Sequence, residues 1–350
     1  MAYTTINKST DYFNTILYTG NASGQTITGV GHQPDFIWVK GRADDGYDHS
    51  LHNSASGVLK KLASNKTDAE VTNTDTITST NADGFVLGAD TAGPAANSVN
   101  QDTKTYVAWN WKAGTTSGLS GGTITPSAYS INTTAGFGIY KYSGNATAGA
   151  TIAHGLGAKP HLIIVKILNT TDNWCGYHQS LGATKRFELN NSTTPTTSST
   201  LWNDTEPTST VFSLGTNGQV NGNGNTYIAY VFTEKAGYSK FGSYVGNGNA
   251  NGTFVYTGFK PKILMLRNIT NGNRNLIFDS KRLGYNPDNY HLGADVNLNE
   301  ESAWGNIDLF SNGFKGRSTD GSMNASNNEY IYWAFGQTLV GTNNIPATAR

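Results

Sequence analysis

Carboxylate and imidazole side chains are most concentrated in the segment Arg42–His52, which reads RADDGYDHSLH. Asp44, Asp45 and Asp48 could offer carboxylate oxygens to a divalent cation, with help from the two imidazoles of the segment. The segment does not follow the EF-hand order of ligands, because it lacks the alternating acidic positions and the terminal glutamate. A solvated loop between strands explains it better, so we expect no metal and no other cofactor. Whether the three aspartates bind a cation stays open at this level.

A second segment, Asn169–Gly182, places Trp174, Tyr177 and His178 close together. Aromatic side chains on loops stack against sugar rings in many lectin-like sandwiches, and Asn and Asp supply hydrogen bonds. The three residues are therefore candidates for glycan contact. The letters WCGYH also fit a strand whose aromatic side chains point inward, and the corresponding segment of a later repeat, Asn275–Arg282, has an apolar core pattern.

Glycoside hydrolysis requires two carboxylates that flank a cleft. The acidic residues considered for such a pair are Glu188, Asp204, Glu206, Glu300 and Glu301. None of them recurs between the repeats described below. The sequence has no nucleophile elbow, P-loop or zinc motif, and Cys175 with His178 nearby does not by itself make a nucleophile and its base. We therefore predict no enzymatic activity and no catalytic residues.

The elements that would carry these residues occur three times along the chain. The phrase YTGN at Tyr18–Asn21 returns as YSGN at Tyr142–Asn145 and as YVGN at Tyr244–Asn247. An apolar run follows each phrase and ends on a cation, at Lys40, Lys166 and Arg267. A unit of roughly a hundred residues is a domain array, because solenoid repeats have periods of about 20–50 residues.

The repeated runs have the character of buried strands. DFIWVK, HLIIVK and KILMLR are short and apolar, and each is entered through a proline, where no ladder hydrogen bond is lost. The closing runs TYVAWNW, TYIAYVF and EYIYWAFGQ are apolar and aromatic, and helical spacing appears only weakly, at Ser56–Asn65. The sequence therefore predicts an all-β fold of three tandem β-sandwich, jelly-roll-like modules with little helix.

Composition gives the expected boundaries of the modules. The first sandwich occupies residues 1–114, a Gly/Ser/Thr-rich linker residues 115–136, and the second sandwich residues 137–237. The third sandwich and a C-terminal tail occupy residues 238–350. Because almost no spacer separates the second and third modules, we expect these two to pack rigidly.

Composition also excludes several classes of protein. The chain has 24 basic and 24 acidic residues, which argues against nucleic-acid or anionic-membrane partners, since both require a clustered positive field. Its 7 Trp, 18 Tyr and 14 Phe exclude disorder, and a single cysteine excludes an intramolecular disulfide. No signal peptide opens the chain and no apolar run reaches the ~18–20 residues of a membrane helix. We expect synthesis in a host cytoplasm and no membrane insertion.

Several phrases resemble a family of tailed-phage virion proteins of marine and environmental phages, which contain a domain of unknown function. The phrases are MAYTTINKSTDYFNTILYTGN, GVGHQPDFIWVK, TYVAWNWKAG, GATIAHGLGAKPHLIIVK, WCGYHQSLGATKRFELN, AGYSKFGSYVGNGNANGTFVYTGFKPKILMLR and YIYWAFGQTLVGTNNIPATAR. The resemblance covers essentially the whole chain and implies a location in the virion, with a role in assembly or host contact. It supplies no catalytic residues. The segment Asp44–Gly57 departs from the family pattern.

Together these observations predict a non-catalytic virion structural protein, a phage tail fibre or adhesin that contacts the host surface. Its expected partners are other virion proteins, further copies of itself and a host surface glycan. Repeated weak sites would then act through avidity. A homotrimer is the expectation for a fibre, although the sequence has no heptads to support it. The alternatives are a capsid decoration or head-fibre protein and a tailspike-like polysaccharide depolymerase. The position on the virion and the receptor stay open.

Overall fold

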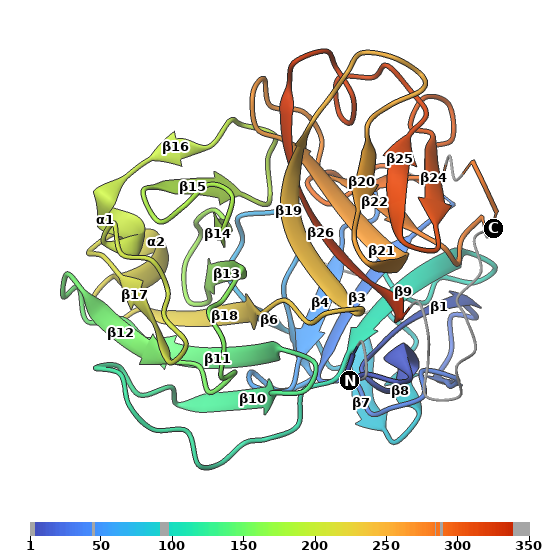
Figure 1. Cartoon of the computed structure of the whole chain (residues 1–350). Helices are drawn as coiled ribbons and strands as arrows, with labels where there is room; N and C mark the ends of the chain where they lie inside the picture. Colours follow the sequence, from blue (N-terminus) through green and yellow to red (C-terminus); the bar gives the residue numbers. More distant parts are fainter. Residues whose placement is uncertain (1–3, 44–45, 92–97, 284, 288–289, 339–350) are drawn as a thin grey trace.

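The computed structural model describes residues 4–43, 46–91, 98–283, 285–287 and 290–338 (Figure 1). Asp44 and Asp45 therefore lie outside the described residues. The strands fall into three modules, which we define as module 1 (residues 4–114), module 2 (residues 115–237) and module 3 (residues 238–338).

The elements of module 1 are η1 (Ser9–Asp11), β1 (Phe13–Thr19), β2 (Gln25–Ile27), β3 (Phe36–Gly41), β4 (Ser50–Asn53), β5 (Lys60–Lys61), β6 (Val71–Thr72), β7 (Ile77–Asn81), β8 (Gly84–Leu87) and β9 (Thr105–Trp111). Those of module 2 are β10 (Ala128–Asn132), β11 (Phe137–Ser143), β12 (Ala150–Ala153), β13 (Leu162–Ile167), β14 (Cys175–His178), β15 (Lys185–Glu188), β16 (Thr196–Thr197), α1 (Ser199–Trp202), β17 (Val211–Leu214), α2 (Gly218–Asn221) and β18 (Thr226–Phe232). Those of module 3 are β19 (Ser239–Val245), β20 (Phe254–Tyr256), β21 (Phe259–Asn268), β22 (Leu276–Asp279), β23 (Leu292–Gly293), β24 (Ile307–Phe310), β25 (Gly313–Gly316) and β26 (Glu329–Thr338).

The threefold sequence repeat is also a repeat of topology. The main sheets contain the orders β1-β9-β3-β4, β11-β18-β13-β14 and β19-β26-β21-β22, and all of these pairs are antiparallel. A small sheet packs on each main sheet: β2-β8-β7, β12-β17 and β20-β25-β24. Within the described ranges helix is limited to three short segments, and Ser56–Asn65 forms turns and β5 instead of a helix. The predicted all-β, multi-module fold is confirmed.

The apolar runs do not alternate with polar residues because both faces of each main sheet are buried. In β3, Ile37 and Val39 face the small sheet of module 1, whereas Phe36 and Trp38 belong to a separate cluster. That cluster, which we call the central core, contains side chains from all three modules. Each main sheet therefore contributes side chains to two cores, that of its own module and the central core.

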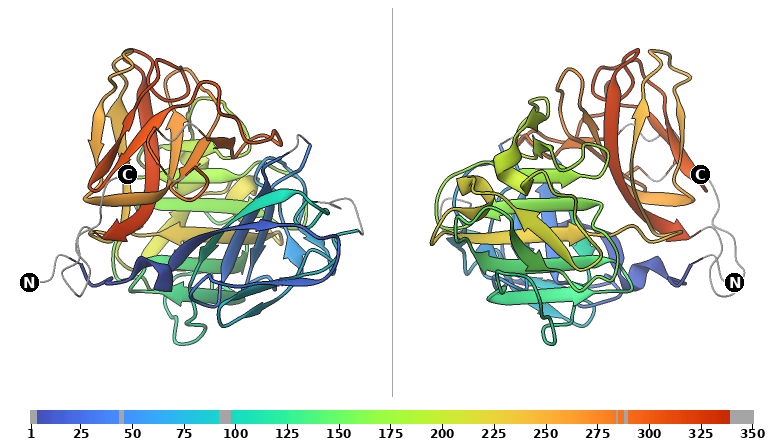
Figure 2. Two further views of the ribbon diagram at one scale, coloured as in Figure 1. Left: turned by 90° about the vertical axis from the view of Figure 1, so that its right-hand side faces the viewer. Right: turned by 60° about the vertical axis from the view of Figure 1, so that its left-hand side comes forward.

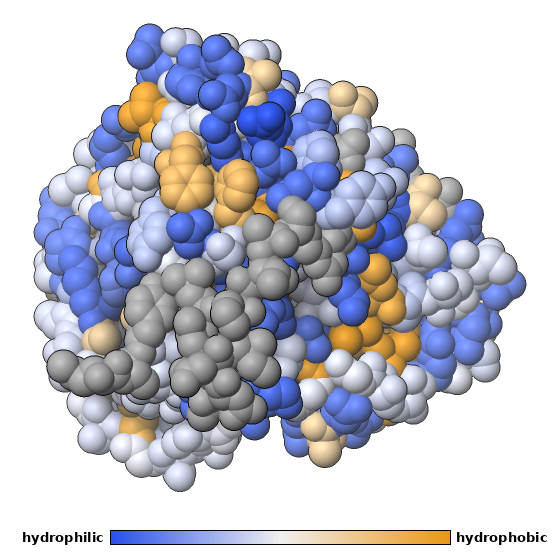
Figure 3. Space-filling view, turned by 45° about the vertical axis from the view of Figure 1, so that its right-hand side comes forward, coloured by the Kyte–Doolittle hydropathy of each residue, from blue (hydrophilic) through white to orange (hydrophobic). Residues whose placement is uncertain are grey.

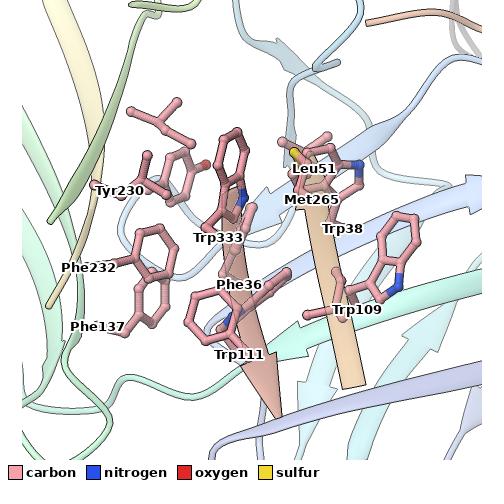
Figure 4. Close-up of a cluster of buried hydrophobic side chains, with 14 of the residues drawn as sticks. Phe36, Trp38, Leu51, Trp109, Trp111, Phe137, Tyr230, Phe232, Met265 and Trp333 are labelled. Atoms are coloured by element: carbon pink, nitrogen blue, oxygen red, sulfur yellow. The ribbon is translucent and has the colours of Figure 1, made fainter. Parts of the chain in front are cut away.

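The central core joins the modules around a common centre (Figures 1, 2 and 4). Equivalent aromatic residues of the closing strands meet there: Trp109, Tyr230 and Trp333, and next to them Trp111, Phe232 and Phe335. Their rings contact across module boundaries, as Phe232 and Phe335 do at 5.4 Å and Trp111 and Phe335 at 5.8 Å between centroids. A cavity of about 30 Å³ with an apolar lining lies inside the central core.

Three buried cations fasten the modules to one another in a cyclic order. They are the penultimate residues of β3, β13 and β21, namely Lys40, Lys166 and Arg267, and none has exposed surface. Each donates hydrogen bonds to backbone carbonyls of a different module. The contacts are Lys40 Nζ to Asn297 O in module 3 (3.4 Å), Lys166 Nζ to Thr67 O in module 1 (3.0 Å), and Arg267 Nη1 to Glu188 O in module 2 (2.9 Å).

The predicted linker at residues 115–136 is corrected by the structure. It contains β10, which pairs with β11, and Ile124 and Ile131 belong to the core of module 2. Thr115 forms a bridge with Ile131, which begins the module directly after β9. The high glycine content reflects turns that require positive φ, as at Gly122 (φ 78°), rather than a flexible spacer.

Candidate functional site

The three residues predicted to contact glycan lie in the interior. Trp174, Tyr177 and His178 have no exposed surface. Tyr177 belongs to the core of module 2, and Trp174 to the central core. A side chain without exposed surface cannot stack on an external sugar, so the structure corrects the glycan-contact prediction in favour of the buried-strand alternative.

Their polar atoms are used inside the protein. The Trp174 indole Nε1 donates to the carbonyls of Ala63 (2.9 Å) and Lys66 (3.1 Å) in module 1. His178 Nε2 lies 3.2 Å from the carbonyl of Tyr332 in module 3, and burial lowers the pKa of this imidazole to about 4. The segment therefore joins module 2 to both neighbours.

The carboxylates and imidazoles of the segment 42–52 are also engaged structurally where they are described. Asp48 pairs with Lys66 at 2.6 Å and accepts a hydrogen bond from the Asn65 amide at 2.7 Å. His49 and His52 are fully buried, and this burial lowers the pKa of each to about 3. Among the residues that the structure describes, no group of three His, Cys, Asp or Glu side chains could hold a metal ion.

The acids considered for hydrolysis lie mainly in ion pairs. The pairs are Glu188 with Arg186 (2.6 Å), Glu206 with Lys159 (2.8 Å), Glu300 with Arg42 (2.6 Å) and Glu301 with Arg274. Asp204 occupies a turn with φ 46°. The pair of Glu300 with Arg42 joins module 3 to module 1, which gives this acid a structural use.

Aromatic side chains do reach solvent on the small sheet of module 3. Phe254 is 45% exposed and Tyr256 is 55% exposed, while Val255 between them points into the core. The half-buried ring of Phe310 contacts Phe254 edge-on, with 5.8 Å between centroids. We call Phe254, Tyr256 and Phe310 the aromatic face.

The aromatic face is specific to one of the three modules. In each small sheet an aliphatic residue pairs with a phenylalanine: Ile27 with Phe85, Ile152 with Phe212, and Val255 with Phe314. The residues that flank the aliphatic position are Thr26 and Thr28 in module 1, Thr151 and Ala153 in module 2, and Phe254 and Tyr256 in module 3. The shared fold therefore does not require aromatic residues there.

Polar groups surround these rings. Phe254 pairs across the strands with Lys315, and Asp308 of β24 forms an ion pair with Arg317 at 3.3 Å. Arg317 Nη1 also donates to Asn251 Oδ1 at 3.3 Å. In Figure 3, hydrophobic side chains are exposed among hydrophilic ones on the side of the molecule that carries β24 and β25. The result is an apolar surface with amide and charged groups at its edge.

A family model, Domain of unknown function (DUF7483), matches residues 8–338. The chain belongs to this family. No curated protein and no solved structure matches it. Because the match runs through all three modules, the DUF7483 domain corresponds to the complete arrangement around the central core and not to one sandwich.

The aromatic face of this DUF7483 domain was missed in the sequence although a signal exists. The segment TFVYTG alternates large aromatic residues around Val255, which is the period of a strand with one exposed face. Aligned with the equivalent segments TITG and TIAHG, it is the only one of the three with aromatic residues on both sides of the aliphatic position. No helix in the described part of the chain is long and apolar enough to cross a membrane.

Proposed function

We propose that this chain is a non-catalytic structural protein of a virion, a tail fibre or adhesin, and that it binds a host surface glycan through the aromatic face. The observation that carries the proposal is the pair Phe254 and Tyr256, exposed at positions where the other two modules have threonine or alanine. The resemblance to tailed-phage virion proteins supports the location in the virion.

The chemistry of the aromatic face suits a sugar. About half of the surface of Phe254 and of Tyr256 is exposed to solvent in the isolated protein. A contiguous exposed apolar patch with a polar rim commonly marks a binding surface. A pyranose ring offers C–H groups to Phe254 and Tyr256. Its hydroxyls would meet the hydrogen-bonding groups of Asp308, Arg317 and Asn251 at the edge of the same sheet.

The architecture affects the avidity with which the protein can attach to a host surface. The three modules of one chain already close the central core, so a trimer is not needed to bury it. Each chain presents one aromatic face, and a single weak sugar site becomes effective only when several copies act together. We therefore propose that the virion displays several copies of this chain as a homo-oligomer or through other virion proteins. Light scattering on the purified protein measures the oligomeric state directly.

Removal of the rings tests the glycan site. We expect Tyr256→Ala and Phe254→Thr each to raise the dissociation constant for host surface polysaccharide at least tenfold, about 1.4 kcal/mol. Their melting temperatures should stay close to that of the unaltered protein, because both side chains are half exposed. Thr28→Ala, at the equivalent position of module 1, is the matched control and should bind normally.

Three results would overturn the proposal. Binding that is unchanged in both aromatic variants would remove the aromatic face as the glycan site. Reducing ends that accumulate when the protein is incubated with host polysaccharide would contradict a non-catalytic role and favour a depolymerase. Binding to isolated capsids, without binding to host cells, would favour a decoration protein.

A further inference from the structure

A second surface feature lies where module 3 meets module 1. A cavity of about 340 Å³ opens there between β1 and the neighbouring ends of β21 and β22. Its lining residues are all polar: Thr10, Asn14, Thr15, Lys260, Lys262, Ser280, Lys281 and Gln337. We call it the seam pocket. Its volume is at the lower end of the roughly 300–1,000 Å³ of small-molecule sites.

The seam pocket has a positive lining in a chain of zero net charge. Lys260, Lys262 and Lys281 contribute ammonium groups, and no acidic residue is among its described lining residues. Burial, followed by repulsion from Lys281 and Lys8, lowers the pKa of Lys262 to about 8. Lys8 itself pairs with Asp11 at 2.8 Å. The folded protein thus maintains an unfavourable concentration of positive charge at this position.

Thr15 adds a second polar feature. Its side chain is 4% exposed, it lines the seam pocket, and its hydroxyl Oγ1 has no hydrogen-bond partner among the described residues. The equivalent residues of the other modules are Ile139 and Phe241, which pair with the matching aromatic residues of β18 and β26 and are buried in the central core. A buried hydroxyl without a partner costs about 1–3 kcal/mol, so the Thr15 hydroxyl requires a partner in the seam pocket, either water or an acceptor atom of a ligand.

At the other two module boundaries, the residue equivalent to Lys262 makes hydrogen bonds within the protein. Lys262 is equivalent to Asp35 and His161. Lys262 directly precedes the strand residue that pairs with Phe335, Asp35 precedes the one that pairs with Trp111, and His161 precedes the one that pairs with Phe232. Asp35 accepts hydrogen bonds from the Ser54 hydroxyl (2.8 Å), the Ala113 amide (2.8 Å) and the Ser130 hydroxyl (2.9 Å). His161 accepts one from the Glu234 amide (3.0 Å), and its ring stacks on Phe241. At the third boundary the equivalent residue lines an open cavity.

We propose that the seam pocket binds a small oxyanion, a phosphate or sulfate group, either free or as a substituent on a sugar. The ammonium groups of Lys262 and Lys281 provide charge-assisted hydrogen bonds, which are the stronger kind. The hydroxyls of Thr15 and Ser280 and the amide of Gln337 provide neutral donors around them. This site is separate from the aromatic face, so its test does not depend on the proposed glycan site.

Isothermal titration calorimetry at pH 7 and low salt tests the proposal, with inorganic phosphate, inorganic sulfate and glucose 1-phosphate as probes. We expect Lys262→Gln to weaken binding at least tenfold and Thr15→Val to weaken it several-fold. Lys185→Gln, the same change on an exposed residue of β15, should bind as the unaltered protein does. Since the buried charge of Lys262 opposes folding, Lys262→Gln should keep or raise the melting temperature.

The outcomes separate the sources of the ligand. Tighter binding of glucose 1-phosphate than of inorganic phosphate supports a phosphorylated sugar, whereas equal affinity supports a free ion. Absence of binding of all three probes at millimolar concentration overturns the proposal. Equal affinities of Lys262→Gln and the unaltered protein for phosphate overturn it as well.

Discussion

Replacement of Arg267 by methionine removes the guanidinium that fastens module 3 to module 2. In the native protein Nη1 donates to the carbonyls of Glu188 and Asn191, both at 2.9 Å, and to Asn275 Oδ1 at 2.6 Å. Nη2 donates to the carbonyl of Thr193. The group also lies over the ring of Phe187, at 5.4 Å from its centroid. Methionine keeps much of the side-chain volume but satisfies none of these acceptors.

The magnitude follows from the acceptors that remain. Each buried carbonyl left without a donor costs about 1–3 kcal/mol. Thr193 is exposed and can regain water, and the Asn191 carbonyl keeps the Asn275 Nδ2 donor at 3.1 Å. The Glu188 carbonyl and Asn275 Oδ1 are buried and lose the guanidinium donor. Burial lowers the pKa of Arg267 to about 10, which shows that the charged guanidinium is unfavourable at this position. Removal of this buried charge offsets part of the stability lost with the hydrogen bonds. We therefore expect the free energy of unfolding to fall by about 3 kcal/mol.

Urea unfolding followed by tryptophan fluorescence measures the change. Arg317→Met is the matched control, because Arg317 is a surface residue whose ion pair should contribute about 0–1 kcal/mol. Because the modules share the central core, both variants should still unfold in one transition. A loss below about 1 kcal/mol for Arg267→Met, relative to the expected ~3 kcal/mol, would refute the role given to this cation. Separate transitions for the modules would refute the shared core.

Three further predictions concern buried side chains. Trp174→Ala should lower the free energy of unfolding by about 3–5 kcal/mol in thermal or urea unfolding, and a loss of glycan binding without destabilisation would contradict its burial. Cys175 should resist thiol reagents in the native protein, because burial raises its pKa to about 12; rapid native labelling would contradict this. Acid should destabilise the protein below about pH 6.5, because His49 and His178 stay neutral when folded but bind protons when unfolded. The stability present above pH 6.5 should be lost by about 1.4 kcal/mol per pH unit for each histidine, down to the folded pKa values of about 3 and 4. His178→Asn should reduce that slope, and an unchanged slope would contradict the assignment.

The strands could be predicted because their signal is local. HLIIVK reads as a buried strand whatever lies around it, and β13 (Leu162–Ile167) occupies that run. The linker prediction failed because glycine and serine content records the need for turns but not whether the turns pack. Ile124 is 6% exposed and belongs to the core of module 2, a contact that depends on how residues 115–136 return along β12.

The site could not be predicted from composition for a related reason. Trp174 and Phe254 are both aromatic residues in short polar segments, yet one is fully buried and the other 45% exposed. What separates them is the presence of a neighbouring module. Trp174 meets the carbonyl of Ala63 in module 1, whereas β20 lies on the side of module 3 away from the central core.

The number of modules, their β-strands and the cation near the end of each central run can be read from the amino-acid sequence, because repetition and periodicity are properties of neighbouring residues. The packing of three sandwiches around one aromatic core became visible only in the folded protein, as did the contacts of Lys40, Lys166 and Arg267 with a different module each. Those facts depend on which sheet faces are paired. A strand with two apolar faces packs against two partners, and its own sequence does not identify the second partner.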